Sequence, residues 1–106
     1  MREPTYYILA ALLDGPMHGW AIIKHAAAAS HGRVTLAVGT LYGALDRLAD
    51  EGRVSVDREE TAQARTRRYY RLTDPGRQAL LAEAARLHHA ARVVTGRRSD
   101  PAAGLA

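Results

Sequence analysis

Four arginines and two tyrosines stand close together in residues 65–71, where the sequence is RTRRYYR and contains no acidic residue. A guanidinium group presents a planar fork of N–H donors that fits the oxygens of a phosphate. A basic run with aromatic residues among the arginines is therefore typical of a phosphate-binding surface. A solvated basic hairpin would have the same composition, and charge alone does not separate these two interpretations.

A second stretch, GTLYGALDRLADEG at 39–52, combines an apolar stripe with an unusual polar side. Leucines at 41, 45 and 48 recur at helical spacing. The opposite side carries Gly39, Gly43 and Arg47, and Thr40 and Tyr42 flank it. Glycine inside a helix costs about 1 kcal/mol relative to alanine, which indicates close approach by another molecule. The alternative is that Tyr42 packs into the core and the glycines lie on a neutral surface.

The five histidines do not form a convincing metal site. His88 and His89 are adjacent, so on a helix they point about 100° apart and cannot bind one ion together. The chain has no cysteine, which excludes thiolate ligands and disulfides. It also lacks the motifs of nucleophilic catalysis and phosphate-binding loops. We therefore expect no metal, no cofactor and no enzymatic activity, and a local hydrogen-bonding role for His18.

These residues must be positioned by a small domain. The 106 residues suffice for one core, but that core would be thin, because alanine is abundant and phenylalanine is absent. Burial against a second copy is therefore expected. We expect a winged-helix unit over 1–73, a dimerisation helix over 74–96 and a flexible tail over 97–106.

Three helices are predicted before the basic run, over 4–14, 18–29 and 38–51. Pro4 suits a first helical turn, Gly15 and Pro16 end the first helix, and Gly52 ends the third. Thr35 is a candidate cap for the third helix. In the second helix Trp20, Ile23 and Ala27 share one face, which favours Trp20 as a core anchor over a ligand-stacking role.

The period then changes from helical to alternating. Residues 54–57 and 67–72 alternate around a polar connector, which predicts a β-hairpin. Its inward-facing residues would be Val54, Val56, Tyr70 and Leu72, and Tyr69 and Arg71 would face outward. On the returning strand, Arg67 should then be more exposed than Arg68.

A last helix is predicted over 73–96, where Thr73 or Asp74 can cap it and Gly96 can end it. Apolar residues repeat along it at spacings of four and three, as in a coiled coil. The first helix is apolar all round, so one side should also meet another subunit. The predicted dimer surface comprises Tyr6, Leu9, Leu13, Leu80, Ala84, Leu87, Ala91 and Val94.

Three helices, a hairpin and a final helix form the order of a winged helix-turn-helix. The fold class expected is mainly α with a small β-hairpin wing and a long C-terminal dimerisation helix. In such folds the second element of the helix-turn-helix enters the major groove of DNA. That element is the stretch at 39–52.

The sequences GTLYGALDRLADEGRV and RTRRYYRLTDPGRQAL, together with LLDGPMHGWAIIK at 12–24, resemble the PadR family, the phenolic acid decarboxylase regulators. The resemblance implies a homodimeric winged-helix transcriptional repressor that pairs through its first and last helices. It also implies that Thr40 and Tyr42 lie at double-stranded DNA and that Arg65, Arg67 and Arg68 contact phosphates. A small-molecule effector of unidentified chemistry is implied as well, but the last helix lacks the aromatic residue that some members use for stacking.

The leading hypothesis is therefore a DNA-binding regulator, a repressor at a palindromic or pseudo-palindromic operator. The alternative is a helical-dimer protein-interaction module that uses the winged-helix surface without binding DNA. Acidic residues on the 39–52 helix favour this alternative, and the arginines at 65–68 argue against it. No stretch resembles a membrane span or a signal peptide, so we expect a cytoplasmic protein that does not use a membrane.

Overall fold

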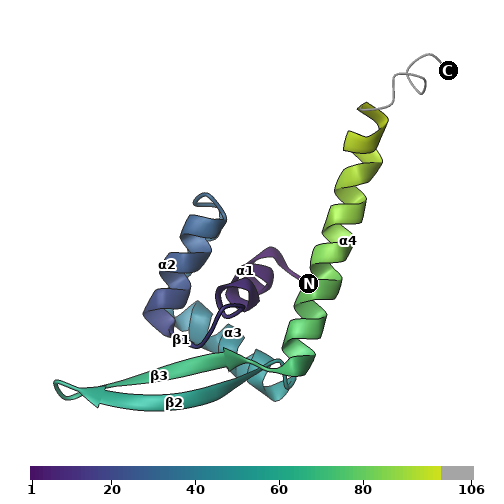
Figure 1. The fold of residues 1–106 in the computed structure, drawn as a ribbon. Helices are drawn as coiled ribbons and strands as arrows, with labels where there is room; N and C mark the ends of the chain where they lie inside the picture. The colour runs from purple at the N-terminus through teal and green to yellow at the C-terminus, as the bar shows by residue number, and fades with distance from the viewer. Residues whose placement is uncertain (99–106) are drawn as a thin grey trace.

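The computed structural model describes residues 1–98, which form four helices and a three-stranded antiparallel sheet (Figure 1). The elements follow the order α1 (Glu3–Ala11), β1 (Met17–His18), α2 (Gly19–Ala29), α3 (Val38–Asp50), β2 (Val54–Ala62), β3 (Arg65–Leu72) and α4 (Asp74–Arg98). This is the predicted winged helix-turn-helix with an added strand, β1. The last helix ends later than predicted, because α4 continues past Gly96 to Arg98. Residues 97 and 98 of the predicted flexible tail are therefore helical, and the remainder of that prediction, 99–106, lies outside the described residues.

The core lies between α1, α2, α3 and the base of the sheet. Its fully buried side chains are mainly leucine and isoleucine: Ile8, Leu9, Leu12, Ile22, Leu41, Leu45, Leu48 and Val54. The predicted stripe on α3 is thus confirmed. Helix α1 ends at Ala11, earlier than predicted, because the next residues form tighter turns in which Leu12 N–H donates to the Leu9 carbonyl at 3.1 Å.

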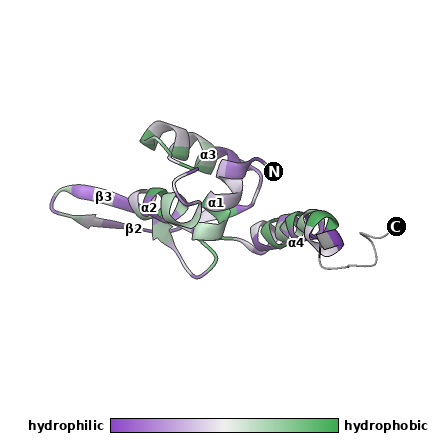
Figure 2. Ribbon diagram, turned by 90° about the horizontal axis from the view of Figure 1, so that it is seen from above, coloured by the Kyte–Doolittle hydropathy of each residue, from purple (hydrophilic) through white to green (hydrophobic). Residues whose placement is uncertain are grey.

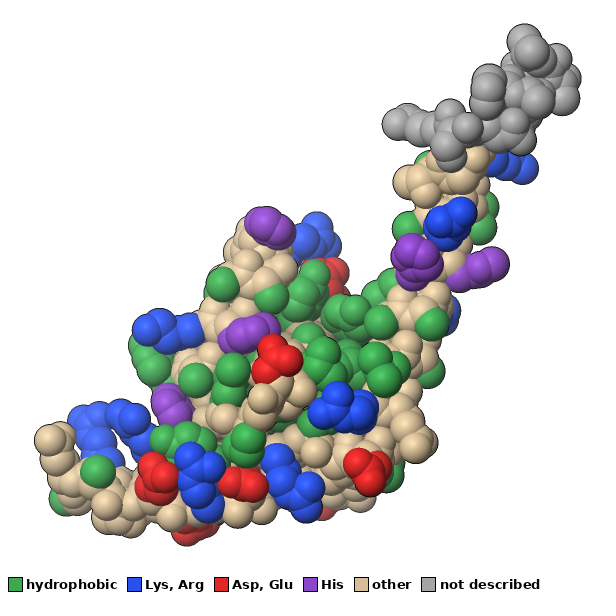
Figure 3. Space-filling view, in the orientation of Figure 1, with side chains coloured by type: hydrophobic (Ala, Val, Ile, Leu, Met, Phe, Trp, Pro, Cys, Tyr) green, Lys and Arg blue, Asp and Glu red, His purple; other side chains and the backbone are tan. Residues whose placement is uncertain are grey.

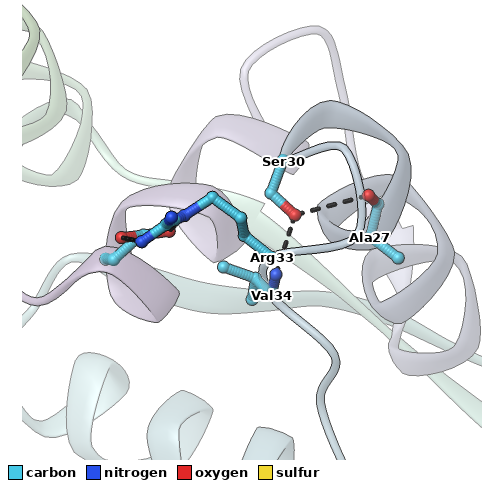
Figure 4. Close-up of polar contacts among 5 residues, drawn as sticks. Ala27, Ser30, Arg33 and Val34 are labelled. Atoms are coloured by element: carbon cyan, nitrogen blue, oxygen red, sulfur yellow. Dashed lines mark hydrogen bonds and ion pairs between the residues drawn. The ribbon is translucent and has the colours of Figure 1, made fainter.

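The connection from α2 to α3 is held by side chains (Figure 4). The Ser30 hydroxyl donates to the Ala27 carbonyl at 3.3 Å and accepts from Val34 N–H at 2.9 Å. Arg33 forms a two-bond ion pair with Glu3 of α1, at 2.8 and 3.2 Å. The hydrogen bond and ion pair lower the pKa of the Glu3 carboxyl. These contacts fix where the chain enters α3.

The start of α3 differs from the prediction. The residue in the N-cap position is Ala37, which supplies no side-chain bond, so the predicted capping role of Thr35 is wrong. Thr35 stands too far before the first helical residue, Val38, to cap it. The predicted end is confirmed: Gly52 adopts a φ of +75°, and Arg53 N–H donates to the Leu48 carbonyl at 2.8 Å.

The hairpin is longer than predicted, because the polar connector is itself strand. β2 and β3 pair over nearly their whole length, and the turn at Gln63 and Ala64 has positive φ at both residues. Beyond the base of the wing, the residues of both strands are exposed, and most of them are polar. A register shift between Val56 and Arg58 turns the wing away from the core, and Val56 is 46% exposed rather than inward. Tyr70 is buried, as predicted.

A tight junction joins the wing to α4. The Thr73 hydroxyl accepts from Gly76 N–H at 3.1 Å and donates to the Gly52 carbonyl at 2.6 Å. Of the two predicted caps, Thr73 is the one that bonds. Gly76 packs so closely on the Arg53 backbone that a Cβ at this position would overlap the Arg53 carbonyl. The junction therefore sets the direction in which α4 leaves the domain.

Removing the Thr73 hydroxyl should loosen this junction. Thr73→Val keeps the side-chain volume but loses both hydrogen bonds, and loss of a cap costs about 0.5–2 kcal/mol. We expect the free energy of unfolding to fall by about 1–2 kcal/mol, measured by urea denaturation at fixed protein concentration. Thr73→Ser, which retains the hydroxyl, is the control and should restore most of the loss. Equal stability of Thr73→Val and the wild type would contradict the capping role.

Helix α4 packs on α1 only through its first turns and then projects from the domain (Figure 1). The radius of gyration is 17.4 Å, well above the value of about 13 Å for a compact chain of this length. In Figure 2, hydrophobic residues recur on the projecting helix. Leu87 and Val94 are 41% and 62% exposed.

Two residues of the predicted dimer surface do not fit that role. Leu9 and Leu80 are 0% and 3% exposed because both belong to the core of the subunit itself. Tyr6, Leu13 and Ala84 are partly buried, and Ala91 is exposed. The surface left free for a second chain is therefore smaller on α1 and lies mainly on the outer part of α4.

Candidate nucleic-acid interface

The first turn of α2 is anchored to the wing. His18 caps this helix, since its Nδ1 accepts the Ala21 N–H at 3.4 Å, which confirms the predicted local hydrogen bond. The His18 ring also meets the Tyr69 ring of β3 edge-on, with centroids 5.3 Å apart. β1 pairs His18 with Tyr69 and Met17 with Tyr70. The start of α2 and strand β3 are therefore held in a fixed relation.

Gly19, the first residue of α2, receives the side chain of Tyr42 from α3. A Cβ at Gly19 would lie 2.7 Å from the Tyr42 hydroxyl, so any larger residue here would push the phenol out of its observed position. Tyr42 remains 39% exposed. The alternative that Tyr42 belongs to the core is therefore wrong: its ring bridges two helices and keeps an accessible edge.

The exposed face of α3 is open at its start and acidic towards its end. A Cβ added at Gly39 or Gly43 would meet no heavy atom within 4 Å beyond the backbone of α3 itself, so the space outside both glycines is open. Asp46 and Asp50 continue the same face at helical spacing and are exposed. Because carboxylates repel phosphates, this distribution favours an approach to DNA by the first two turns only.

Thr40 and Tyr42 lie on opposite flanks of that face. Thr40 borders a hollow formed with α1 and the α2–α3 connection, which includes Glu3 and Arg33. Tyr42 borders the hollow toward the wing. The two side chains therefore lie on the flanks, as predicted, and their hydroxyls would contact opposite sides of a molecule bound along α3.

The predicted role of Arg47 is not supported by its position. Its Nη2 donates to the Thr5 hydroxyl of α1 at 3.0 Å. It borders a hollow with Thr5, Glu51 and Arg53, apart from the one that Tyr42 borders. The reason is its place on the helix: Arg47 lies two turns beyond Gly39, where its exposed side chain reaches Thr5 of α1.

The arginines of the wing differ in their partners. Arg68 forms an ion pair with Glu59 across the strands at 3.1 Å. Hydrogen bonds to Tyr70 and Glu59 raise the pKa of the Arg68 guanidinium. Arg65 and Arg67 are exposed, and within residues 1–98 neither forms an ion pair. Glu60 lies across the strands from Arg67, and its carboxyl pKa is lowered by Arg58 and to a smaller extent by Arg67. Arg65 and Arg67 are therefore the wing charges best placed to meet a phosphate.

Arg58 is engaged on the second strand of the wing. It pairs with Glu60 at 2.8 Å and with Asp57 at 3.0 Å, and both partners raise its pKa. Its guanidinium also lies 4.0 Å from the centroid of the Tyr69 ring. Arg58 thus supports the shape of the wing, whereas Arg65 and Arg67, nearer its tip, form no ion pair within residues 1–98.

These elements enclose one basic groove, which we call the wing groove. It has a volume of about 470 Å³ and is lined by His18, Gly19, Trp20, Tyr42, Arg65, Thr66, Arg67 and Arg68. None of these lining residues is acidic. Figure 3 shows arginine side chains (blue) on the outer part of the wing, below α2 in this view. The groove therefore joins three of the predicted arginines with Tyr42 of α3.

Trp20 is the main residue whose position was predicted wrongly. It is 61% exposed on the rim of the wing groove and is not a core anchor. The buried row of α2 comprises Gly19, Ile22 and Ala26, one position earlier than the predicted row. An apolar, alanine-rich helix offers two such rows, and the sequence did not discriminate between them.

Two other residues at this surface were not selected from the sequence. Val38, at the first turn of α3, is 56% exposed, and Gly19 makes room for Tyr42. The residue type of Val38 suits a core, and Val38 lies at helical spacing before Leu41. Its position as the first residue of α3, ahead of the buried leucines, was the one feature of the sequence that indicated exposure.

Among the residues that the structure describes, no group of three potential metal ligands converges, and no helix is long and apolar enough to cross a membrane.

Comparison with known proteins agrees with this geometry. Residues 8–82 match the model of the transcriptional regulator PadR-like family. A search of curated proteins gave no match. Bacillus subtilis PadR, solved in complex with operator DNA, is 26% identical, with a TM-score of 0.69, over 78% of this chain and 47% of that one.

Two further solved structures are similar over most of their length. A PadR family transcriptional regulator from Eggerthella lenta is 27% identical, with a TM-score of 0.70, over 90% of this chain and 80% of that one. A PadR family regulator from Clostridium difficile has a TM-score of 0.74 at 21% identity, over 90% of this chain and 97% of that one, which concerns the fold alone. With a family model matching most of its residues, the chain belongs to the transcriptional regulator PadR-like family.

Proposed function

We propose that this DNA-binding regulator is a homodimeric repressor that contacts a pseudo-palindromic operator through the first turns of α3 and through the wing. The observation that carries the proposal is the wing groove, where Tyr42 of α3 and the exposed Arg65 and Arg67 of the wing line one space. Gly39 and Gly43 leave room for DNA to approach. The solved operator complex of a relative supports the same kind of partner.

The second chain would pack on the projecting part of α4 and the exposed side of α1. Leu87, Ala91 and Val94 recur there at coiled-coil spacing, and exposed apolar side chains favour association. Burial of apolar area contributes about 25 cal/mol per Å². A twofold dimer would present two copies of α3 to half-sites about one helical turn apart.

Sedimentation velocity with a fluorescent duplex tests both parts of this proposal. The protein alone should sediment with twice the mass of the chain at micromolar concentration. With a duplex taken from the region next to its own coding sequence, two chains should sediment with one duplex. A monomer under the same conditions would contradict the dimer. A dimer that leaves this duplex and a random duplex free would instead favour a protein-docking module.

Thr40 and Tyr42 should carry sequence preference. Loss of a base-directed contact costs about 1–3 kcal/mol on the cognate site. Thr40→Ala and Tyr42→Phe, which remove hydroxyls while leaving the core intact, should therefore weaken cognate binding more than random binding in anisotropy titrations. Equal weakening on both duplexes would assign these hydroxyls to phosphates.

No catalytic role is proposed, because the assembled surface presents arginines, hydroxyls and aromatic rings without an activated nucleophile. We also propose a small-molecule effector of unidentified chemistry, and this part rests on the family alone. A cytoplasmic location is part of the proposal, since the proposed partner is DNA.

A further inference from the structure

Trp20 stands out as a large apolar side chain left in water at the edge of a basic groove. It is 61% exposed, and Lys24 lies one turn further along α2 with its Nζ 5.9 Å from the ring centroid. Tryptophan is enriched where protein surfaces become buried on binding, because it offers a large rigid area. Its exposure here therefore indicates a contact that the free chain does not make.

The opposite wall of the wing groove is an open strand edge. β1 pairs only with Tyr69 and Tyr70, so within residues 1–98 no strand covers the edge of β3 at Arg65–Arg68. Arg65 and Arg67 stand on this stretch without ion-pair partners. The groove thus has a basic wall on the wing and an aromatic rim on α2.

The chemistry that fits such a groove alternates anionic and apolar groups. A DNA strand has this pattern, since phosphates alternate with deoxyriboses along it. Phosphate and sugar contacts position a protein on the duplex without reading its sequence. A flexible acidic peptide would satisfy the arginines but would offer nothing regular to Trp20.

We propose that the wing groove holds the sugar-phosphate backbone of one strand of the duplex that α3 contacts, with Trp20 packed on a deoxyribose and Arg65 and Arg67 on the flanking phosphates. This inference rests on the proposed DNA binding and adds a contact to it. Lys24 stands beside Trp20 to meet the next phosphate. Tyr42, held against Gly19, forms the floor between this strand and the base-facing side of α3.

The contact of Trp20 differs physically from those of the arginines. Phosphate pairing releases counterions and depends on salt, whereas packing of an indole on a sugar does not. Trp20→Ala should therefore weaken cognate and random duplexes alike, by about tenfold, without changing the slope of log affinity against log salt. Trp20→Phe should recover part of the loss.

The experiment uses the full chain and a fluorescein-labelled duplex, with anisotropy and intrinsic fluorescence followed in one titration. Trp20 is the chain's one tryptophan, so its emission reports this position alone. On binding, we expect the emission to change and the ring to become protected from acrylamide, with cognate and random duplexes alike. Val56→Ala, which alters an exposed apolar residue outside the groove, is the matched control and should leave affinity unchanged.

The outcomes separate the two proposals. Binding seen by anisotropy with an unprotected Trp20, and with Trp20→Ala within twofold of the wild type, would overturn the groove contact while DNA binding stands. A salt slope that becomes shallower in Trp20→Ala would also overturn it, because the loss would then be electrostatic. If the anisotropy does not change with any duplex, the protein does not bind DNA, and both the proposed function and the groove contact are contradicted. Circular dichroism of each variant verifies that the fold is retained.

Discussion

Gly76→Ala is expected to destabilise the protein more than any other single methyl addition at its glycines. The added Cβ would overlap the carbonyl of Arg53, which is backbone and cannot rotate away. Overpacking of this kind costs about 1–3 kcal/mol and sometimes more, and here α4 must shift to relieve it. We expect a loss of about 3 kcal/mol in urea denaturation, together with weaker DNA binding because the wing base and α4 share this junction.

Gly96→Ala in the same helix is the matched control. A Cβ there meets no heavy atom within 4 Å, so alanine should be neutral or stabilise the helix by up to about 1 kcal/mol. Both variants are compared at one protein concentration, since dimerisation would make stability concentration-dependent. Equal stability of Gly76→Ala and Gly96→Ala would contradict the close packing of α4 on Arg53.

The double variant Arg65→Ala/Arg67→Ala is expected to have the largest effect on DNA binding. Each neutralised phosphate contributes about −0.9 to the slope of log affinity against log salt. A dimer presents each wing twice, so four lost contacts should make the slope shallower by up to about 3.6. Affinity at low salt should fall by at least tenfold on cognate and random duplexes alike, because phosphate contacts carry no sequence information.

Anisotropy titrations across a salt series measure this slope. Arg86→Ala is the control, because Arg86 is also an exposed arginine but lies on α4, paired with Glu83. Its slope should equal that of the wild type. Arg68→Ala should change the slope less than Arg67→Ala, because Glu59 already offsets the charge of Arg68. A double variant with the wild-type slope would show that the wing does not touch the DNA backbone.

The helices could be predicted from the sequence because their apolar residues recur at helical spacing and glycine or proline marks several ends. The stripe of Leu41, Leu45 and Leu48 had no competing periodicity, and Gly52 ended the helix as expected. Helix α2 was harder, since alanine fills both of its faces. The choice of face there depended on tertiary packing, and Trp20 was consequently misplaced.

The wing shows a second reason for limited prediction. Its outer strands have no buried face, so no hydrophobic alternation marks them; cross-strand pairs such as Glu59 with Arg68 and Arg58 stacked on Tyr69 accompany the ladder instead. The turn has Gln63 and Ala64 at positive φ; glycine or asparagine at these positions would have predicted a turn from the sequence. The two residues of β1 are too few to form a recognisable pattern.

The sequence predicted which charged residues form the candidate site, but it did not predict how the elements bring them together. The arginines at 65–68 and Tyr42 were found from residue type and spacing, and the structure brings them to one groove. Arg47 was assigned to the same face by its helical position, but its guanidinium donates a hydrogen bond to Thr5 of α1. Leu9 and Leu80 had suitable types for a subunit interface, yet the small domain needs both in its own core.

In the proposed complex, the first turns of α3, the first turn of α2 and the wing form one surface for DNA. Amide chemical-shift mapping of the full-length protein during titration with a duplex tests it directly. We expect the shifts to gather at residues 38–43, 18–24 and 65–68, and the outer part of α4 to change little. Shifts that gather on α4 and spare the wing groove would contradict it.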